Sequence, residues 1–264
     1  MMIDVQNQPD KRDIDIDKVG VKNITYPIIV FDRTKGKQHT IATINMFVDL
    51  PRHFKGTHMS RFIEILNTYH GHVDFRSFLE ILDELQRSLN ARSAHCEMTF
   101  PFFIEKKAPV SGEKSLMEYR CSYIGEANEK GKKFLVGVQA PITTVCPCSR
   151  EISARGAHNQ RGVVTVRLLF KKFFWIEDII ALIEDCASAD VYALLKREDE
   201  KALTERAYDN PMFVEDVVRE IAVKLNKDPN FPWFSVEAEN FESIHNHSAY
   251  AFYEKKTLQE IENK

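Results

Sequence analysis

Two cysteines and a histidine lie close together in one stretch of the chain, "PITTVCPCSREISARGAHNQRG", residues 141–162. Cys146 and Cys148 are one residue apart, and His158 follows twelve residues after Cys146. Thiolate and imidazole are common protein ligands for zinc, so this stretch could bind a metal. A disulfide, a redox pair and loop cysteines with no ligand role are the alternatives that the spacing leaves open.

The number of ligands in this stretch bears on the kind of metal site. A structural zinc site wants four protein ligands, and a second Cys/His cluster is missing. A catalytic site needs three ligands and an open position for water, so a third ligand must come from elsewhere. Acidic helix residues could supply it, particularly "KREDEK", residues 196–201, although such a run is also typical of a solvated face. A redox pair is disfavoured because Cys-x-x-Cys is the usual oxidoreductase spacing.

Two further histidines, His245 and His247, lie in "ESIHNHSAY" near the end of the chain. Residues two apart in an extended segment face the same side, so the pair could act as general acid–base groups or as metal ligands. Two exposed histidines at a turn before the last strand explain the pattern equally well.

A basic segment, "RHFKGTHMSRF", precedes an expected helix in the first half of the chain. Its cations Arg52, Lys55 and Arg61 lie near a helix N-terminus, an arrangement that can bind an anion. A basic loop with Thr57 or Ser60 as the helix N-cap is the alternative.

The composition limits the class of protein. The chain has 264 residues, 44% of them hydrophobic, and a net charge of -3, so it is not built to coat nucleic acid. No apolar run is long enough to span a membrane. Five cysteines, an odd number, together with a polar N-terminus that lacks an export signal, predict a cytoplasmic protein with reduced thiols.

The expected secondary structure occurs as a pattern that appears twice. In each half, two strands are followed by helices and then by two more strands. In the first half we expect strands at 19–34, 39–50, 93–106 and 115–127, and helices at 59–69 and 75–89. In the second half we expect strands at 134–144, 162–173, 233–243 and 247–256, and helices at 175–195, 200–209 and 211–227, the last opened by Pro211.

This order predicts an α+β protein made of two tandem units, each an antiparallel sheet with helices packed on one face. We expect a loose N-terminal arm at residues 1–18, a first unit at 19–128 and a second unit at 129–264 that carries most of the metal site. The unpaired sheet edges favour symmetric assembly with further subunits.

The motifs together resemble those of the type IB GTP cyclohydrolase I family. The resemblance rests on "ITTVCPCSREIS", "GAHNQRG", "KGTHMSRF" and "ESIHNHSAY", and it covers nearly the whole chain after the arm. It implies tandem tunnelling-fold units, a homotetramer with active sites at subunit interfaces, and a divalent metal, zinc or manganese. The implied reaction is hydrolytic opening of GTP to formate and 7,8-dihydroneopterin triphosphate, the first step of tetrahydrofolate biosynthesis.

The resemblance also implies the residues that hold the metal. Cys146 and His158 match two metal ligands of the family, and Glu200, in the acidic run noted above, matches the third. Cys148 matches the second cysteine of the family's "CPC" motif and is expected to line the site. The loss of Cys146 is expected to abolish activity most directly.

The resemblance also implies a second set of residues, which are expected to contact the substrate. Glu215 matches the glutamate that anchors the guanine base, and His245 and His247 match histidines near the reacting ring. His58 and Arg61 fall in the segment expected to approach the triphosphate. The rival readings are an archaeal-type cyclohydrolase with a cyclic-phosphate product, a non-catalytic metal-binding module, and a thiol oxidoreductase.

Overall fold

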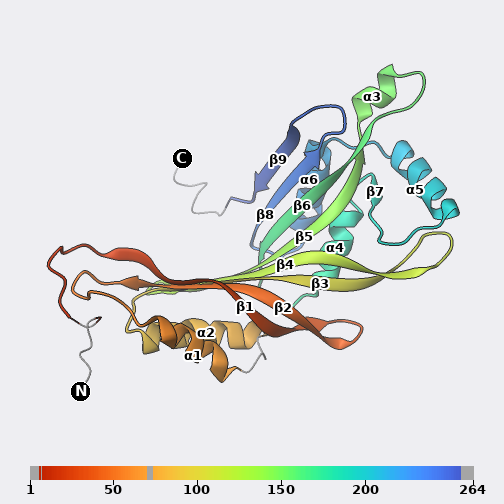
Figure 1. The fold of residues 1–264 in the computed structure, drawn as a ribbon. Coiled ribbons are helices and arrows are strands. Elements are labelled where there is room, and N and C mark those ends of the chain that lie inside the picture. The colour runs from red at the N-terminus through yellow and green to blue at the C-terminus, as the bar shows by residue number, and fades with distance from the viewer. Residues whose placement is uncertain (1–5, 7, 70–73, 257–264) are drawn as a thin grey trace. The chain divides into compact units, whose positions relative to one another are not determined.

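The chain forms two compact units in a computed structural model that describes residues 6, 8–69 and 74–256 (Figure 1). Unit 1 is formed within residues 1–101 and 122–136, and unit 2 within residues 102–121 and 137–264. Three long strands each have one part in unit 1 and the other part in unit 2. The domain boundary predicted at residue 128 therefore stays a prediction. The first five residues and residue 7 of the predicted arm, and residues 257–264 of the predicted second unit, lie outside the described residues.

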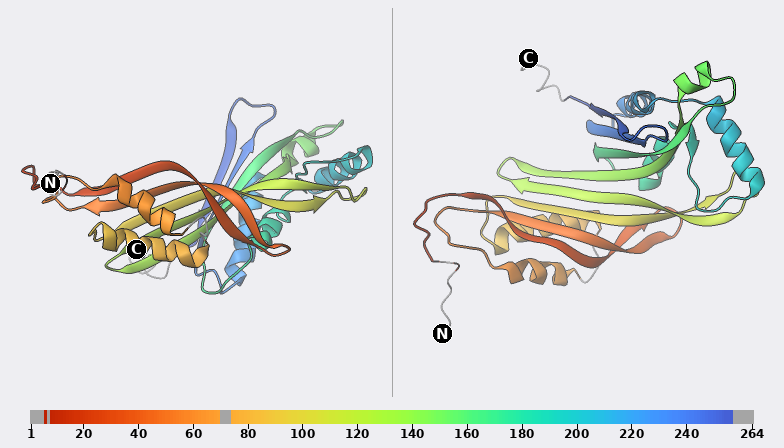
Figure 2. Two further views of the ribbon diagram at one scale, coloured as in Figure 1. Left: turned by 60° about the horizontal axis from the view of Figure 1, so that its bottom comes forward. Right: turned by 45° about the horizontal axis from the view of Figure 1, so that its top comes forward.

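Unit 1 is an antiparallel sheet with two helices on one face (Figure 2). Its strands follow the order β1-β2-β3-β4-β5, and its helices α1 and α2 lie between β2 and β3 in the sequence. The bounds are β1 (Ile16–Asp32), β2 (Gly36–Leu50), α1 (Met59–Thr68), α2 (Phe75–Ser88), β3 (Ala94–Lys107), β4 (Lys114–Asn128) and β5 (Gly131–Val145).

Alternation along β2 shows how the sequence selects the buried face of unit 1. Ala42, Ile44 and Met46 are fully buried, whereas Ile41, directly before Ala42 and on the opposite face, is 58% exposed. This period of two is typical of a strand with one face against a core. Gly125 of β4 lets α2 pack closely, because a Cβ there would lie 2.4 Å from the ring of Phe78.

Unit 2 contains the other parts of β3, β4 and β5, extended by β6, β8 and β9, with the short β7 paired to β5. Its sheet is antiparallel where β6 meets β8 and where β8 meets β9. The bounds are α3 (Pro147–Ile152), β6 (Asn159–Leu169), α4 (Ile176–Glu184), β7 (Ala189–Asp190), α5 (Arg197–Asp209), α6 (Val214–Lys227), β8 (Trp233–Phe241) and β9 (Ser248–Glu254).

The core of unit 2 lies between this sheet and its helices. Helix α6 buries Val217, Ile221 and Leu225 at helical spacing, and β8 buries Val236 and Ala238 at strand spacing. The predicted α+β class, with antiparallel sheets and helices on one face, is therefore confirmed. Among the described residues, no helix is both long and apolar enough to cross a membrane.

Two predicted helix boundaries are wrong, and a third helix begins where predicted, at residue 59, but with a different N-cap. Helix α4 ends at Glu184 instead of continuing to residue 195, because the chain then leaves the helix and forms β7 against β5. Helix α6 begins at Val214, so Pro211 lies in the turn before it, and the helix is capped where Asp216 Oδ2 accepts from Phe213 N at 3.1 Å. Helix α1 has His58 as its N-cap, without a side-chain cap bond, instead of Thr57 or Ser60.

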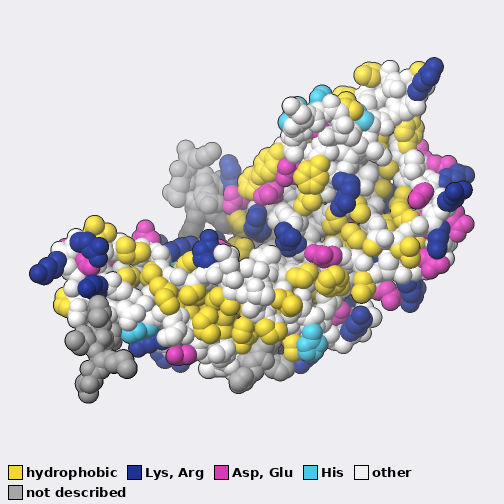
Figure 3. Space-filling model, in the orientation of Figure 1, with side chains coloured by type: hydrophobic (Ala, Val, Ile, Leu, Met, Phe, Trp, Pro, Cys, Tyr) yellow, Lys and Arg dark blue, Asp and Glu magenta, His cyan; other side chains and the backbone are white. Residues whose placement is uncertain are grey.

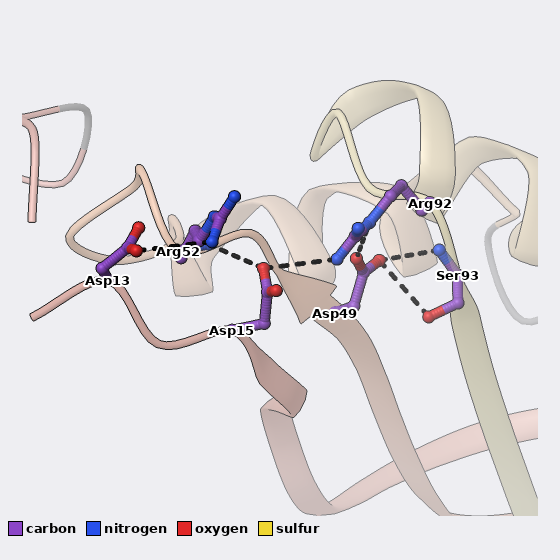
Figure 4. A network of polar contacts seen from close by, with 6 residues as sticks. All are labelled: Asp13, Asp15, Asp49, Arg52, Arg92 and Ser93. Carbon is purple, nitrogen blue, oxygen red and sulfur yellow. Dashed lines mark hydrogen bonds and ion pairs between the residues drawn. The ribbon is translucent and has the colours of Figure 1, made fainter.

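The described part of the N-terminal arm is not loose. Arg52 N donates to Asp15 Oδ1 at 2.9 Å, and Arg52 Nη1 donates to Asp13 Oδ2 at 3.3 Å (Figure 4). The backbone N–H of Lys55 donates to the carbonyl oxygen of Gln8 at 3.1 Å. Arg52 therefore already has carboxylate partners, which weakens its prediction as a cation for a bound anion.

The same network continues to a buried aspartate. Asp49 Oδ2 accepts from Arg92 Nε at 2.8 Å, and Asp49 Oδ1 accepts from Ser93 N at 2.7 Å (Figure 4). Burial alone would raise the pKa of Asp49, but the hydrogen bonds from Arg92 and Ser93 outweigh it and hold the pKa below its ordinary value. The charged carboxylate thus ties the end of β2 to the start of β3.

Candidate active site

A cavity of about 250 Å³ in unit 2 brings together residues from four parts of the chain that are far apart in sequence. It contains a thiol, three imidazoles and two carboxylates, which is an unusual concentration of reactive groups. The residues that line it are Cys146, His158, Gln160, Met212, Phe213, Val214, Glu215, Asn240, Glu242, His245, His247 and Ala249.

Cys146 and His158 meet because the loop between them folds back on itself. Cys146 is the N-cap of α3, a short helix that the sequence analysis did not predict, with Pro147 at its first position. Cys146 N donates to the carbonyl oxygen of His158 at 3.1 Å, and His158 N donates to Ser149 Oγ at 3.1 Å. Ser149 N donates to Cys146 Sγ at 3.4 Å. These bonds fix the loop so that both side chains face one cavity, as expected.

The ring of His158 is oriented by a buried relay. Its Nδ1 lies 3.0 Å from Gln160 Oε1, and Gln160 Nε2 donates to Thr144 Oγ1 at 2.9 Å. Gln160 is 7% exposed and Thr144 is fully buried. The NH₂ group of Gln160 donates to Thr144, so the Gln160 oxygen is the atom that faces His158 and accepts from Nδ1–H. The other ring nitrogen, Nε2, then carries the lone pair.

His245 and His247 are exposed in the turn between β8 and β9, which is the second of the two alternatives that the sequence left open. Their rings stack with centroids 5.1 Å apart and an interplanar angle of 18°. Both side chains are exposed and line the cavity. They are therefore placed where they can exchange protons with a bound molecule.

Glu215 enters the cavity from the first turn of α6. The start of this helix is tied to the end of β5 because Met212 N donates to the carbonyl oxygen of Val145 at 3.0 Å. Val145 directly precedes Cys146, so this bond holds Glu215 on the same side of the unit as the thiol. A carboxylate in the first turn is also favoured by the helix dipole.

Glu200 is exposed on α5 and is not among the residues that line the cavity. Within the described residues, no group of three His, Cys, Asp or Glu side chains has the arrangement of a metal site. Leu203 and Ala207, on the same stripe of α5 as Glu200, pack with Ala157 and Val145, the residues directly before His158 and Cys146. Leu203 and Ala207 therefore face the cysteine–histidine loop, whereas Glu200, one turn before Leu203, is exposed.

The residue before Glu200 anchors this end of α5. Asp199 is fully buried and accepts four hydrogen bonds, from Ser111 Oγ at 2.6 Å and from the backbone N–H groups of Val110, Ser111 and Lys196 at 2.8 to 2.9 Å. Burial would raise the pKa of Asp199, but these hydrogen bonds lower it below its ordinary value. The acidic run thus contains one buried anchor, Asp199, and two exposed carboxylates, Glu198 and Glu200.

Three other predicted site residues lie outside the cavity. Cys148 is exposed on α3 and does not line it, and all five cysteines are free thiols. His58 and Arg61 lie at the start of α1 in unit 1. Arg61 Nη1 donates to the carbonyl oxygen of Ser88 at 2.8 Å. Arg61 also lines a separate cleft of unit 1, whose wall includes the carboxylate of Glu84.

Sequence reasoning missed three polar residues of the cavity, Gln160, Asn240 and Glu242. Asn240 and Glu242 are two apart at the end of β8, so strand alternation places them on one side. Gln160 follows His158 at the same spacing. Gln160 could therefore have been predicted from His158, because residues two apart on a strand share a side. Asn240 could not, because its place in the cavity depends on where β8 lies in the fold.

Comparison with known proteins places the chain in a family. The family described as type I GTP cyclohydrolase folE2 matches residues 2–251. GTP cyclohydrolase FolE2 of Syntrophus aciditrophicus (strain SB) is 64% identical over 255 residues, which cover 97% of this chain and 100% of that protein. The protein of the same name from Syntrophotalea carbinolica is 62% identical over 253 residues, which cover 96% of this chain and 95% of that protein.

Solved structures give an independent view of the fold. Uricase from Arthrobacter globiformis matches with a TM-score of 0.55 at 6% identity, over 92% of this chain and 94% of that chain. At this identity the likeness shows the fold alone, and it confirms the predicted tunnelling-fold class. The family match over residues 2–251 and the identity to these relatives lead to one conclusion. The chain belongs to the type I GTP cyclohydrolase FolE2 family.

Proposed function

We propose that the protein hydrolyses GTP to formate and 7,8-dihydroneopterin triphosphate, the first step of tetrahydrofolate biosynthesis. Membership of the FolE2 family over residues 2–251 supports this reaction. The observation that carries it in the structure is the cavity shared by Cys146, His158, Glu215 and His245. These side chains offer metal ligands, a base anchor and a proton donor within one site of unit 2.

Two donors of the cavity, together with Glu200 from outside it, would hold a divalent metal, zinc or manganese. Cys146 supplies a thiol sulfur, and His158 supplies Nε2, because its other ring nitrogen is held by Gln160. Glu200 would complete the set from α5, whose Leu203 and Ala207 face this loop. A divalent cation at such a site acidifies a bound water and so supplies hydroxide at neutral pH.

Gln160 should matter for the metal although it does not touch it. Gln160→Ala removes the acceptor that orients His158, and losing such a supporting partner typically costs about 10–100-fold in metal affinity. Titration of the metal-free protein with Zn²⁺ or Mn²⁺ measures this loss. Thr144→Val, which removes only the hydroxyl that orients Gln160, should have a smaller effect in the same direction. An unchanged affinity in Gln160→Ala would contradict the orienting role.

Glu215 suits recognition of guanine. Its carboxylate can accept from N1–H and from the 2-amino group of the base, whereas adenine does not present this pair of donors. His245 is exposed in the cavity and can donate a proton to N7 or to the departing nitrogen as the imidazole ring opens. His247 stacks on His245 at the same cavity and is a second candidate for proton transfer. Cys148 remains a proposed contributor from the neighbouring helix α3.

The triphosphate needs cations that this cavity lacks. A volume of about 250 Å³ is below the roughly 300–1,000 Å³ usual for drug-sized ligands, so it suits a base better than a whole nucleotide. We assign the triphosphate to His58 and Arg61 of α1, supplied by a neighbouring subunit. This assignment makes the working site one that forms between copies of the chain.

We therefore propose a homotetramer with active sites at subunit interfaces. The final strand β9 is a sheet edge, and it exposes Tyr250 by 60% and Phe252 by 51%. Hydrophobic side chains gather at the surface over β9 (Figure 3). Together with α6, this strand lines a mostly apolar groove of about 380 Å³, and Glu215 borders both the groove and the cavity. An edge of this kind is a natural surface for a second copy.

Substitution at this edge tests the assembly. Phe252→Arg places a charge on the apolar strand and is expected to shift the tetramer toward smaller species in analytical ultracentrifugation. Turnover of GTP should fall with it if the site is shared between subunits. Arg76→Glu, an exposed charge change on α2, is the control and should leave the sedimentation coefficient unchanged. A wild-type protein that sediments as a monomer would exclude the tetramer.

The free thiols of the chain fit a reducing compartment, and we propose the cytoplasm as its location.

Product analysis separates the proposed reaction from an archaeal-type one. After incubation with GTP, a linear triphosphate on the pterin is expected, and a cyclic phosphate would assign the reaction to the other type. A protein that binds metal but yields no pterin would be the non-catalytic module. Turnover that needs no metal but requires both Cys146 and Cys148 would favour the oxidoreductase.

A further inference from the structure

Asn240 lines the cavity and carries an unpaired polar atom. The residue is 2% exposed, and it lines the cavity together with Glu215, His245 and His247. Its carbonyl oxygen Oδ1 is buried and has no hydrogen-bond partner among the described residues. Buried amide oxygens are nearly always paired, so an unpaired one in a site wall points to a partner that the protein itself does not supply.

The side chain of Asn240 lies against a glycine of the neighbouring strand. Gly162 of β6 is the direct cross-strand partner of Asn240. A Cβ at position 162 would lie 2.4 Å from Asn240 Oδ1, so any other residue there would collide with the amide. Oδ1 therefore lies against Gly162 in this structure, and a turn about the Cβ–Cγ bond, a torsion with broad preferences, would bring it into the cavity when a donor is bound there.

The missing partner of Oδ1 must be a hydrogen-bond donor. This step rests on the proposed function, in which Glu215 accepts from N1–H and from one N–H of the 2-amino group of guanine. A base held in this way keeps one donor on that edge, the second N–H of the 2-amino group. We propose that Asn240 Oδ1 accepts this N–H and is a further specificity-determining residue for the guanine base.

This pairing gives the site three acceptors for the three donors on one edge of guanine. Hypoxanthine lacks the 2-amino group, so it would leave Asn240 and one Glu215 oxygen without partners. A site that leaves its own buried polar groups unpaired discriminates strongly against the analogue. Asn240 therefore selects for the 2-amino group of the base and makes no contact with the 6-oxo group.

Binding of three nucleotides to Asn240→Ala tests the pairing. Affinities for GTP, ITP and 2-aminopurine riboside triphosphate are measured by calorimetry with the full-length protein. The variant should bind GTP and the 2-aminopurine nucleotide about 5–10-fold more weakly than the wild type, the value of one hydrogen bond. Its affinity for ITP, which has no 2-amino group, should be unchanged.

Two controls separate this effect from a change in the fold. Asn240→Ala removes an unpaired buried acceptor, so the nucleotide-free variant should unfold at the same or a higher temperature than the wild type. Asn67→Ala makes the same change at an exposed site on α1 and should alter none of the three affinities.

The outcomes are distinguishable. Equal losses for all three nucleotides, a loss for ITP alone, or no loss at all would overturn the role of Asn240 while leaving the proposed reaction intact. A wild-type protein that binds GTP no better than ITP would instead overturn the anchoring of guanine by Glu215, and the inference would fall with it.

Discussion

Cys146→Ala is expected to abolish the conversion of GTP to pterin and to remove the bound metal. The variant deletes a sulfur ligand, and His158 and Glu200 alone give a site with too few protein ligands to hold the ion. The loss should exceed the roughly 10–100-fold that removal of an orienting partner costs. Metal content by mass spectrometry and formate release from GTP, measured on the same sample, check both parts.

Cys146→Ser separates the metal from the local fold. Serine can accept the hydrogen bond that Cys146 Sγ takes from Ser149 N, and it is a favoured N-cap, so α3 should persist. Its hydroxyl is a much poorer zinc ligand than a thiolate, so activity should still be lost. A Cys146→Ser protein with full metal content and full turnover would show that the thiol is not a ligand.

Glu215→Gln is expected to lower kcat/KM for GTP by about 10⁴ while metal content stays at the wild-type level. The amide keeps the size of the side chain but replaces one acceptor oxygen with a donor, which then faces an N–H of guanine. Glu215 is not a proposed ligand, and it lies on α6, away from the cysteine–histidine loop in sequence. Steady-state kinetics with GTP and a metal assay test the two statements separately.

A matched change on the same helix gives the control for Glu215→Gln. Glu220 is exposed on α6 and does not line the cavity, so Glu220→Gln should leave both kcat/KM and metal content unchanged. Unaltered GTP turnover in Glu215→Gln would exclude the anchoring role. A parallel loss of metal would show that Glu215 acts through the metal and not through the base.

Much of the fold could be predicted because its strands and helices have clear periodicity. The failure at α4 has a local cause. The segment after Glu184 is rich in Ala and Leu, which favour a helix, but Ser188 Oγ accepts from Val145 N at 3.1 Å and β7 pairs with β5. Tertiary hydrogen bonds of this kind override helix propensity, and a sequence does not display them.

The site could be predicted only where its residues are close in sequence or match a known family. The spacing of Cys146 and His158 was enough to predict a shared loop. Residue types alone singled out His245 and the acidic run around Glu200. Glu215, and the choice of Glu200 within that run, came from the family resemblance, because no periodicity connects α5, α6 and the β8–β9 turn. Asn240 escaped both routes, since its part depends on the register that places it opposite Gly162.

The most direct test of a metal-dependent GTP cyclohydrolase is one assay on one preparation. Purified protein is treated with a chelator, incubated with GTP, and followed for formate and for the fluorescent pterin formed on oxidation. We predict no product after chelation and recovery of both products when Zn²⁺ or Mn²⁺ is added back. Equal pterin formation with and without the chelator, or none after metal is restored, would contradict a metal held by Cys146, His158 and Glu200.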